Sequence, residues 1–349
     1  MSILKKLVYS ISVMLGVVVM VFLLFNATTD NSAGMTLGQR ADVMSIDAVN
    51  KEFGLDQPMS ARLLFYINDL IPLSVHQNNE ENKTKYQYIK LLSSGSNVMV
   101  IKKPYLRRSY QSRQGVNQII AAAMPGTFIL ATAAMIFATI LGIIFGIICS
   151  LYKDKWPDKL ILFVSTFGIS MPSFFAAIIV SWFFGFLLSA YTGLDMTGSL
   201  LEYDLDRGNY IRWRNLILPA FTLGIRPLAI ITQLTRSSML EVMHQDYIRT
   251  AVAKGLSPLK VVWKHALRNA LNPVVTAVSG WFASLMAGAF FVEYVFNWNG
   301  IGKVTVEALE KSDLPVVMGA VVTVAALFVI INLLVDLSYR WLDPRVRTE

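Results

Sequence analysis

The stretch DYIRTAVAKGLSPLKVVWKHALRNALNPV, residues 246–274, is basic and lies between two long apolar runs. Residues 241–254 contain no helix breaker, and Gly255 suits the left-handed position that ends a helix. Ser257 and Pro258 then suit the N-cap and the first position of a new helix. We therefore predict two helices joined by a tight corner, the second running from Pro258 to about Leu271.

The second helix is expected to carry two different stripes at helical spacing. One is apolar and comprises Leu259, Val262, Trp263 and Ala266. The other is basic and comprises Lys260, Lys264 and Arg268. Such a corner suits docking into a groove on another protein. The alternative is a basic loop that lies on anionic lipid headgroups.

The composition is that of a membrane protein. The chain has 349 residues, of which 54% are hydrophobic and only 15% charged, whereas a soluble domain carries about 25% charged residues. The net charge of +8 does not call for a nucleic-acid partner, because membrane proteins concentrate Lys and Arg in cytoplasmic loops. The single cysteine, Cys149, excludes a disulfide and a multi-cysteine metal site, and no metal site is predicted.

Six stretches are long and apolar enough to span a membrane, which takes roughly 20 residues. We place them within residues 1–26 and near 127–151, 160–188, 216–235, 269–292 and 314–335. The fold class predicted is an all-α membrane protein with six transmembrane helices. Its parts are the first helix (1–26), an enlarged external segment (27–113) and a five-helix core (114–349) with a cytoplasmic loop at 237–272.

The orientation follows from the short loops, since Lys and Arg favour the cytoplasmic side. With both termini inside, the cytoplasmic segments hold far more Lys and Arg than the short outer loops do. Segment 27–113 is then external. We expect one or two short amphipathic helices in its residues 45–70 and a solvated loop at QNNEENKTK, residues 77–85.

The corner resembles the EAA loop of ABC-importer permeases, in the form found in the oligopeptide/dipeptide (and nickel) branch. Arg249-Thr250-Ala251 stands where the general pattern has Glu-Ala-Ala, and Gly255 stands at its glycine. His265 stands at a later aliphatic position, and Arg268 replaces the usual proline. The form of the peptide branch fits more closely, at residues 249–251, 253–256, 265–267, 269–271 and 273–274.

Other stretches resemble the same family, namely LTRSSMLEVMHQDYIRTA (234–251), GISMPSFF (168–175), EYVFNWNGIGKV (293–304) and LVDLSYRWLDPRVR (334–347). The resemblance covers the first span and everything from about residue 114 onward. It is weaker over 27–113, where the family's Gly-Asp-x-Gly-x-Ser stretch is missing.

The resemblance implies a permease of the bacterial inner membrane that works with other subunits. Expected partners are a second homologous permease, two ATPase subunits, an external solute-binding protein and membrane lipid. ATP and Mg²⁺ belong on the ATPase subunits, and no cofactor or catalytic residue is expected here. In agreement, Gly302-Lys303 is followed by Val304 and not by Ser or Thr, so no P-loop is formed.

In this interpretation the corner presses into a cleft of an ATPase subunit. Gly255 would let its backbone approach closely, and Ala251 would keep the docking face shallow. Arg249 and Lys254 would pair with acids of the ATPase. Thr250, Leu256 and His265 complete the expected coupling set.

Two proline sites are candidates for the translocation pathway. Pro172, between Ser170 and Ser173, should kink the third span, with hydroxyls partnering the freed carbonyl. Arg226-Pro227 should interrupt the fourth span. Arg226 either meets a peptide carboxylate, forms a structural ion pair within the permease pair, or lies near a membrane interface because the span is shifted.

Two other classes remain as alternatives. An ATP-independent secondary transporter or channel would favour intramembrane acids or symmetric broken helices, and the sequence has neither. A membrane-embedded enzyme would need a nucleophile or a metal cluster within the spans. The cargo stays open among a dipeptide, a longer peptide, a nickel chelate, glutathione and an antimicrobial peptide.

Overall fold

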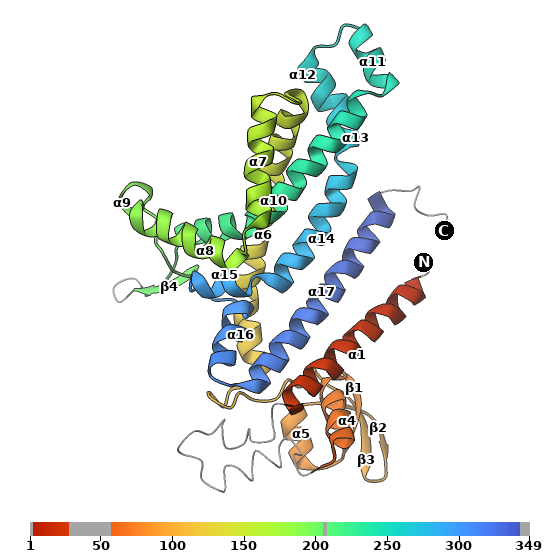
Figure 1. Ribbon diagram of the computed structural model, residues 1–349. Helices are drawn as coiled ribbons and strands as arrows, with labels where there is room; N and C mark the ends of the chain where they lie inside the picture. The colour runs from red at the N-terminus through yellow and green to blue at the C-terminus, as the bar shows by residue number, and fades with distance from the viewer. Residues whose placement is uncertain (1–2, 28–56, 205–207, 343–349) are drawn as a thin grey trace. The chain divides into compact units, whose positions relative to one another are not determined.

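The computed structural model describes residues 3–27, 57–204 and 208–342, and most of them are helical (Figure 1). The chain divides into two compact units. The first comprises Met1–Ala122 with Val304–Ala326, and the second comprises Ala123–Lys303 with Leu327–Glu349. Each unit is described by itself.

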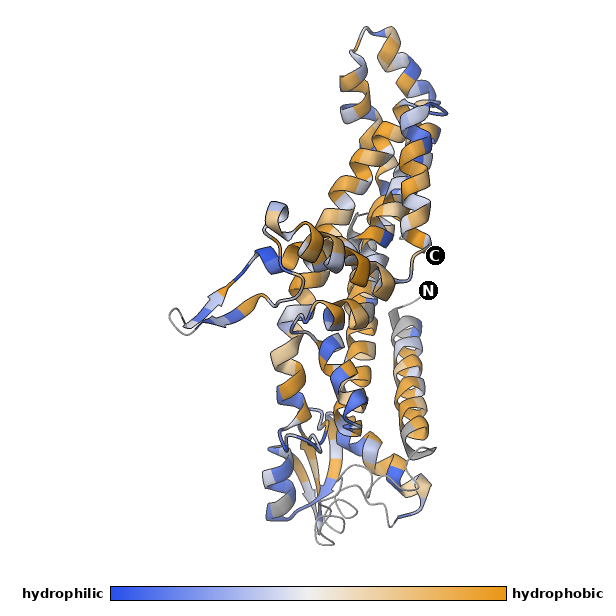
Figure 2. Ribbon diagram, turned by 60° about the vertical axis from the view of Figure 1, so that its left-hand side comes forward, coloured by the Kyte–Doolittle hydropathy of each residue, from blue (hydrophilic) through white to orange (hydrophobic). Residues whose placement is uncertain are grey.

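Long apolar helices occupy the expected positions of several spans. Three are long and apolar enough to cross a membrane, namely α6 (Val116–Leu151), α10 (Arg214–Met243) and the Leu314–Val335 part of α17 (Leu314–Leu342). Two bent helix pairs raise the number of candidate spans to as many as five among the described residues. Helix α1 (Ile3–Ala27) adds a shorter apolar stretch, Val8–Leu24. Figure 2 shows these helices as predominantly hydrophobic. The count of six spans and the side of each terminus stay predictions.

Segment 27–113, whose external side stays a prediction, holds a small sheet that no sequence pattern indicated. Helix α4 (Met59–Leu70) confirms an amphipathic helix in residues 45–70, of which 45–56 lie outside the described residues. Strands β1 (Leu73–Gln77), β3 (Asn97–Ile101) and β2 (Ile89–Ser94) form an antiparallel sheet in that order. The expectation of a loop at 77–85 is wrong, because helix α5 (Glu80–Tyr86) begins there, with the Asn79 side chain accepting from the Asn82 N–H.

The first unit is held together by a small apolar core and a buried carboxylate. Val18, Val21 and Phe22 of α1 pack against Tyr66 of α4. Before α6 begins, the chain is tied to the start of α17 by Asp313, which accepts hydrogen bonds from the Ser109 hydroxyl and the Tyr110 N–H. These contacts join segments far apart in sequence, which is why no local pattern predicts them.

In the second unit, α6 and α10 cross closely at small residues. A Cβ added at Gly142 would lie 2.8 Å from a side-chain carbon of Ile231, and one added at Gly146 would lie 2.4 Å from Cβ of Thr235. Glycine is needed at both positions because these separations are far below van der Waals contact. Helix α10 runs without interruption through Pro219 and Pro227, so the expected break at Arg226-Pro227 is wrong.

The rest of this unit is assembled around α6 and α10. The remaining elements, in chain order, are α7 (Trp156–Ser170), α8 (Ser173–Trp182), the π-helix η2 (Phe183–Leu187), α9 (Ser189–Thr192), β4 (Leu201–Asp204), β5 (Gly208–Ile211), α11 (Asp246–Ala253), α12 (Pro258–Lys260), the π-helix η3 (Val261–Ala266), α13 (Leu267–Ala270), α14 (Asn272–Gly288) and α15 (Phe290–Val295). Helix α16 (Ile301–Glu310) begins in this unit, and its residues from Val304 onward belong to the first. Strands β4 and β5 form an antiparallel hairpin. The core is built from α6, α8, α10, α14 and α15, with Leu130, Ile231 and Trp298 among its most buried side chains.

Candidate functional site: the corner and the broken helix

The predicted corner forms at the end of α10, as a helix pair that projects from the second unit (Figure 1). Gly255 has a φ of +76°, the left-handed conformation expected of it. The Leu256 N–H donates to the Ala251 carbonyl and the Gly255 N–H to the Val252 carbonyl. These two bonds are the Schellman arrangement that closes a helix C-terminus. The corner (residues 246–271) is therefore a hydrogen-bonded turn.

The second arm of the corner contains a π-helix at its centre, Val261–Ala266, which divides the expected apolar stripe. Val262 and Ala266 are buried, whereas Leu259 is 71% exposed and Trp263 is 59% exposed. In a π-helix the hydrogen bonds join residues five apart, so each turn holds an extra residue. Val261 and Ala266, five apart, consequently both face inward. The prediction that one stripe carries all four apolar residues is wrong.

The inward faces of both arms form one small core. Ala251 packs in it together with Ile248, Val261, Val262 and Ala266. Met239 of α10 and Ile147 of α6 belong to the same cluster. Ala251 therefore closes the corner from within, and the expectation that it lies on an outer docking face is not met. Sequence reasoning missed Met239, which falls in the predicted cytoplasmic loop at 237–272 and stands at none of the expected coupling positions.

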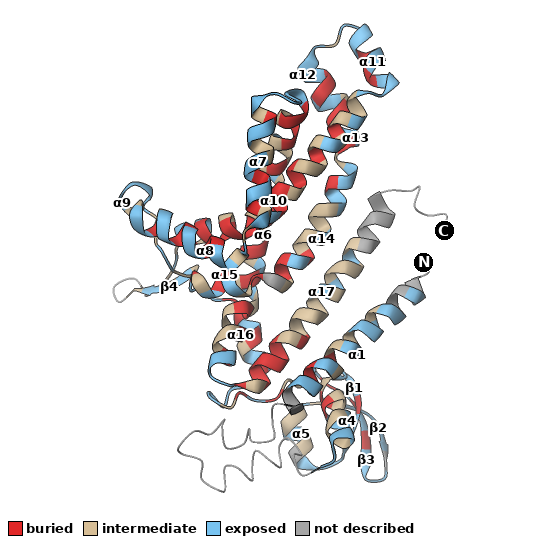
Figure 3. Ribbon diagram, in the orientation of Figure 1, coloured by how far each residue is buried: buried red, intermediate tan, exposed pale blue. Residues whose placement is uncertain are grey.

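Much of the corner is exposed (Figure 3), and its exposed side chains are basic with apolar residues among them. Leu259 and Trp263 provide the large apolar side chains. Arg249, Thr250 and Lys254 are exposed, as are the residues of the basic stripe, Lys260, Lys264 and Arg268. The ion pair between Arg249 and Asp246, at 3.6 Å, is exposed and therefore weak. Leu256 and His265 are half-buried at the edge.

Both arms continue into long helices. The first arm follows α10 after a turn at His244 and Gln245, and the second leads into α14 through a bend of 54° at Leu271. The Asn269 side-chain amide donates to the Tyr247 hydroxyl at 2.8 Å, so the two arms are also linked to each other. A force on the corner therefore reaches two helices of the core at once.

The third predicted span is broken at Pro172 and not merely kinked. Helices α7 and α8 meet at 111°. The Ser170 hydroxyl donates to the Thr166 carbonyl at 2.9 Å, so it supports α7 before the break. Arg226 of α10 donates from Nε and Nη2 to the carbonyl of Ile169, each at 3.4 Å. The guanidinium thus partners a carbonyl in the last turn of α7, where the helix dipole is negative.

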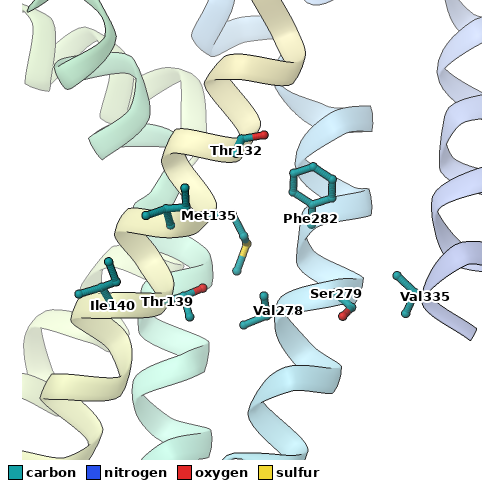
Figure 4. Close-up of a pocket in the computed structure, with 9 residues that line it drawn as sticks. Thr132, Met135, Thr139, Ile140, Val278, Ser279, Phe282 and Val335 are labelled. Atoms are coloured by element: carbon teal, nitrogen blue, oxygen red, sulfur yellow. The ribbon is translucent and has the colours of Figure 1, made fainter. Parts of the chain in front are cut away.

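Two of the cavities formed by described residues of this unit bear on the candidate pathway. One, of about 440 Å³, is lined by residues of α6, α14 and α17, with Met135, Val278 and Phe282 lying toward the space between α6 and α14 (Figure 4). Two hydroxyls of its lining turn to their own helices, because Ser279 donates to the Val275 carbonyl and Thr132 to the Phe128 carbonyl. The other, of about 150 Å³, lies at the α7–α8 break and includes Ser173 and Arg226.

The sequence matches two families. Residues 138–348 match the binding-protein-dependent transport system inner membrane component family, and residues 1–131 match the N-terminal family of the same transport systems.

Named relatives cover nearly the whole chain. The dipeptide transport system permease protein DppB of Alkalihalophilus pseudofirmus is 33% identical over 98% of both chains. The di/tripeptide transport system permease protein DppB of Pseudomonas aeruginosa is 34% identical over 99% of this chain and 98% of its own. The glutathione transport system permease protein GsiC of Salmonella typhimurium is 32% identical over 99% and 98%. The chain is therefore a multi-pass inner-membrane protein that belongs to the binding-protein-dependent ABC-importer permeases, in their peptide branch.

Proposed function

We propose that this chain forms half of a peptide translocation pathway and couples it to ATP hydrolysis through the corner. The observation that carries the proposal is the outward face at Leu259 and Trp263, ringed by exposed Lys and Arg. Large apolar side chains surrounded by charge are the usual anchors of a protein interface. The expected partner surface is a cleft with an apolar floor and an acidic rim on each of two ATPase subunits.

Coupling through the corner requires that it move as one body. The Schellman turn at Gly255, the shared core around Ala251 and the Asn269–Tyr247 hydrogen bond support this. The arms lead into α10 and α14, so a displacement of the corner would tilt both helices. The helices need two packed arrangements of similar free energy for such switching.

The wider assembly follows from the family. We propose a second homologous permease as the other half of the pathway and an external solute-binding protein as the source of cargo. ATP and Mg²⁺ would be held by the ATPase subunits. Relatives named for dipeptides, di/tripeptides and glutathione favour a peptide cargo. An ATP-independent secondary transporter is the less favoured alternative.

The test replaces the two apolar anchors by acids. Leu259→Asp and Trp263→Glu should leave the chain in the membrane but abolish co-purification of the ATPase subunits and uptake of a radiolabelled dipeptide. The matched control is Tyr203→Glu, since Tyr203 is 72% exposed on the β4–β5 hairpin, far along the chain from the corner. Normal ATPase retention in both corner variants, or uphill transport by the purified chain alone, would refute the proposal.

A further inference from the structure

The cavity at the α7–α8 break is small, and a single cationic side chain, Arg226, is part of its lining. Its volume of about 150 Å³ is below the roughly 300–1,000 Å³ of sites that enclose a drug-sized ligand. Helices α7, α8, α10 and α14 all contribute to its lining. The site has the size for one functional group of a larger molecule.

Arg226 brings a positive charge that the described part of the chain does not neutralise. Its hydrogen-bond partner is the Ile169 carbonyl, which accepts from Nε and Nη2. No carboxylate lies within ion-pair distance of it among residues 3–27, 57–204 and 208–342. The carbonyl fixes the plane of the guanidinium, and among the described residues Nη1 has no hydrogen-bond acceptor. An arginine in a membrane span is costly unless a cavity or an anion faces it.

Three further hydrogen-bonding side chains line the same cavity. Ser173, Trp281 and Ser284 have no hydrogen-bond partner within the described residues, whereas the hydroxyl of Thr222 donates to the Leu218 carbonyl. Hydroxyl and indole N–H groups are all donors. Around them Met171, Leu223 and Leu285 supply apolar surface. The lining therefore offers one charge and several unused donors to an acceptor-rich anion.

The break between α7 and α8 also favours an anion in this cavity. Helix α8 begins at Ser173, so its first backbone N–H groups and the positive end of its dipole lie at the cavity. Gly168 permits the close approach, because a Cβ there would lie 2.6 Å from a side-chain carbon of Ile225, the neighbour of Arg226.

We propose that this cavity binds the carboxylate of the cargo, which for a peptide is its C-terminal carboxylate, with Arg226 as the residue that recognises it. The inference rests on the proposed transport of peptides and deepens it. A planar guanidinium already oriented by Ile169 loses little freedom when it binds a carboxylate. The donors at Ser173, Trp281 and Ser284 would take the remaining oxygen lone pairs, and the peptide side chains would lie outside the cavity.

The experiment uses the complete importer, with its ATPases, second permease and binding protein, in proteoliposomes. Uptake of trialanine is compared with uptake of trialanine amide, which lacks the carboxylate. Arg226→Gln should lower trialanine uptake about tenfold or more, as expected for loss of a charge-assisted hydrogen-bonded pair, and leave amide uptake unchanged. Arg226→Lys should retain part of the preference for trialanine over trialanine amide. Because every variant uses the same binding protein, its own selectivity cancels in the ratio of variant to parent.

The control is Arg214→Gln, the same substitution at the exposed start of α10, which should change neither peptide. Trp281→Phe provides a milder second variant and should lower uptake of the free acid only. ATP hydrolysis stimulated by the loaded binding protein should persist in all of them, whereas failure of the coupling proposal would abolish it in the corner variants. Two results would show a structural role for Arg226 and overturn the inference. One is an equal loss of trialanine and trialanine amide uptake in Arg226→Gln. The other is recovery of uptake in Arg226→Gln when an acidic residue of the second permease is also removed.

Discussion

Asp158 at the start of α7 accepts two hydrogen bonds from Arg236 near the end of α10, from Nε and Nη2, each 2.7 Å long. The carboxylate is 2% exposed and the guanidinium side chain 21% exposed. Oδ2 of Asp158 also accepts a third hydrogen bond, from the Asp154 N–H at 2.9 Å. The pair therefore joins two helices in a geometry that leaves few polar atoms unsatisfied.

Removing one member of this pair should be strongly destabilising. Asp158→Ala leaves a partly buried guanidinium without its carboxylate, and breaking a buried pair costs about 3–5 kcal/mol. We expect a clear fall in the thermal unfolding temperature of the detergent-solubilised chain. The double variant Asp158→Leu/Arg236→Met removes both charges and should recover much of the loss. A double variant no more stable than Asp158→Ala would contradict this explanation.

Two substitutions at Gly255 separate backbone strain from surface bulk. A Cβ added there meets no atom within 4 Å in the described chain, yet φ is +76°. Both Gly255→Ala and Gly255→Trp therefore incur about 1–2 kcal/mol of backbone strain, but only tryptophan adds bulk to the outward face. We expect both variants in the membrane, with ATPase co-purification retained by alanine and lost by tryptophan. Equal retention by the two would count against docking at this corner.

The crossing of α6 and α10 should tolerate no added methyl at Gly146. An added Cβ would lie 2.8 Å from the Thr232 carbonyl oxygen, which is backbone and cannot rotate away. Gly146→Ala should destabilise the chain by about 1–3 kcal/mol through overpacking. The matched control is Gly280→Ala in α14, where a Cβ has open space and alanine favours the helix by up to about 1 kcal/mol. The unfolding temperature should fall in Gly146→Ala and rise in Gly280→Ala. A shift of both in the same direction would disprove the explanation.

Glu293 should make stability depend on pH near neutrality. Burial raises the pKa of Glu293 to about 7, even though its Oε2 accepts the Gly302 N–H at 2.7 Å. The unfolded carboxyl titrates near 4.3, so between about pH 4.5 and 7 the folded chain holds the proton more tightly than the unfolded chain does. The contribution of Glu293 to the free energy of unfolding is therefore greatest at low pH and is lost as pH rises to about 7.

The measurement is the unfolding temperature of the parent chain and of Glu293→Gln from pH 5 to 8. Glutamine keeps an acceptor for the Gly302 N–H and does not ionise, so the parent should become less stable relative to the variant as pH rises. A constant difference across this range would show that the carboxyl does not titrate there.

Several features of this chain were decided by local sequence. The apolar runs predicted α6, α10 and part of α17, because crossing lipid demands a long uninterrupted stretch of apolar residues. Gly255 and Pro258 predicted the corner, because a left-handed residue and a fixed φ are requirements of the backbone itself. The resemblance to the permease family was confirmed by matches to residues 1–131 and 138–348, whereas the role of the corner stays a prediction.

Only tertiary structure decided the remainder. The five-residue strands β1 and β3 are too short to stand out in sequence and are stabilised by pairing with each other. The division of the apolar stripe between Val262 and Trp263 depends on a π-helix that packing against α10 and α6 selects. The pairing of Asp158 with Arg236, and of Arg226 with Ile169, joins positions far apart in the chain. Local propensity carries no information about such contacts, because their energy arises only when the helices are already side by side.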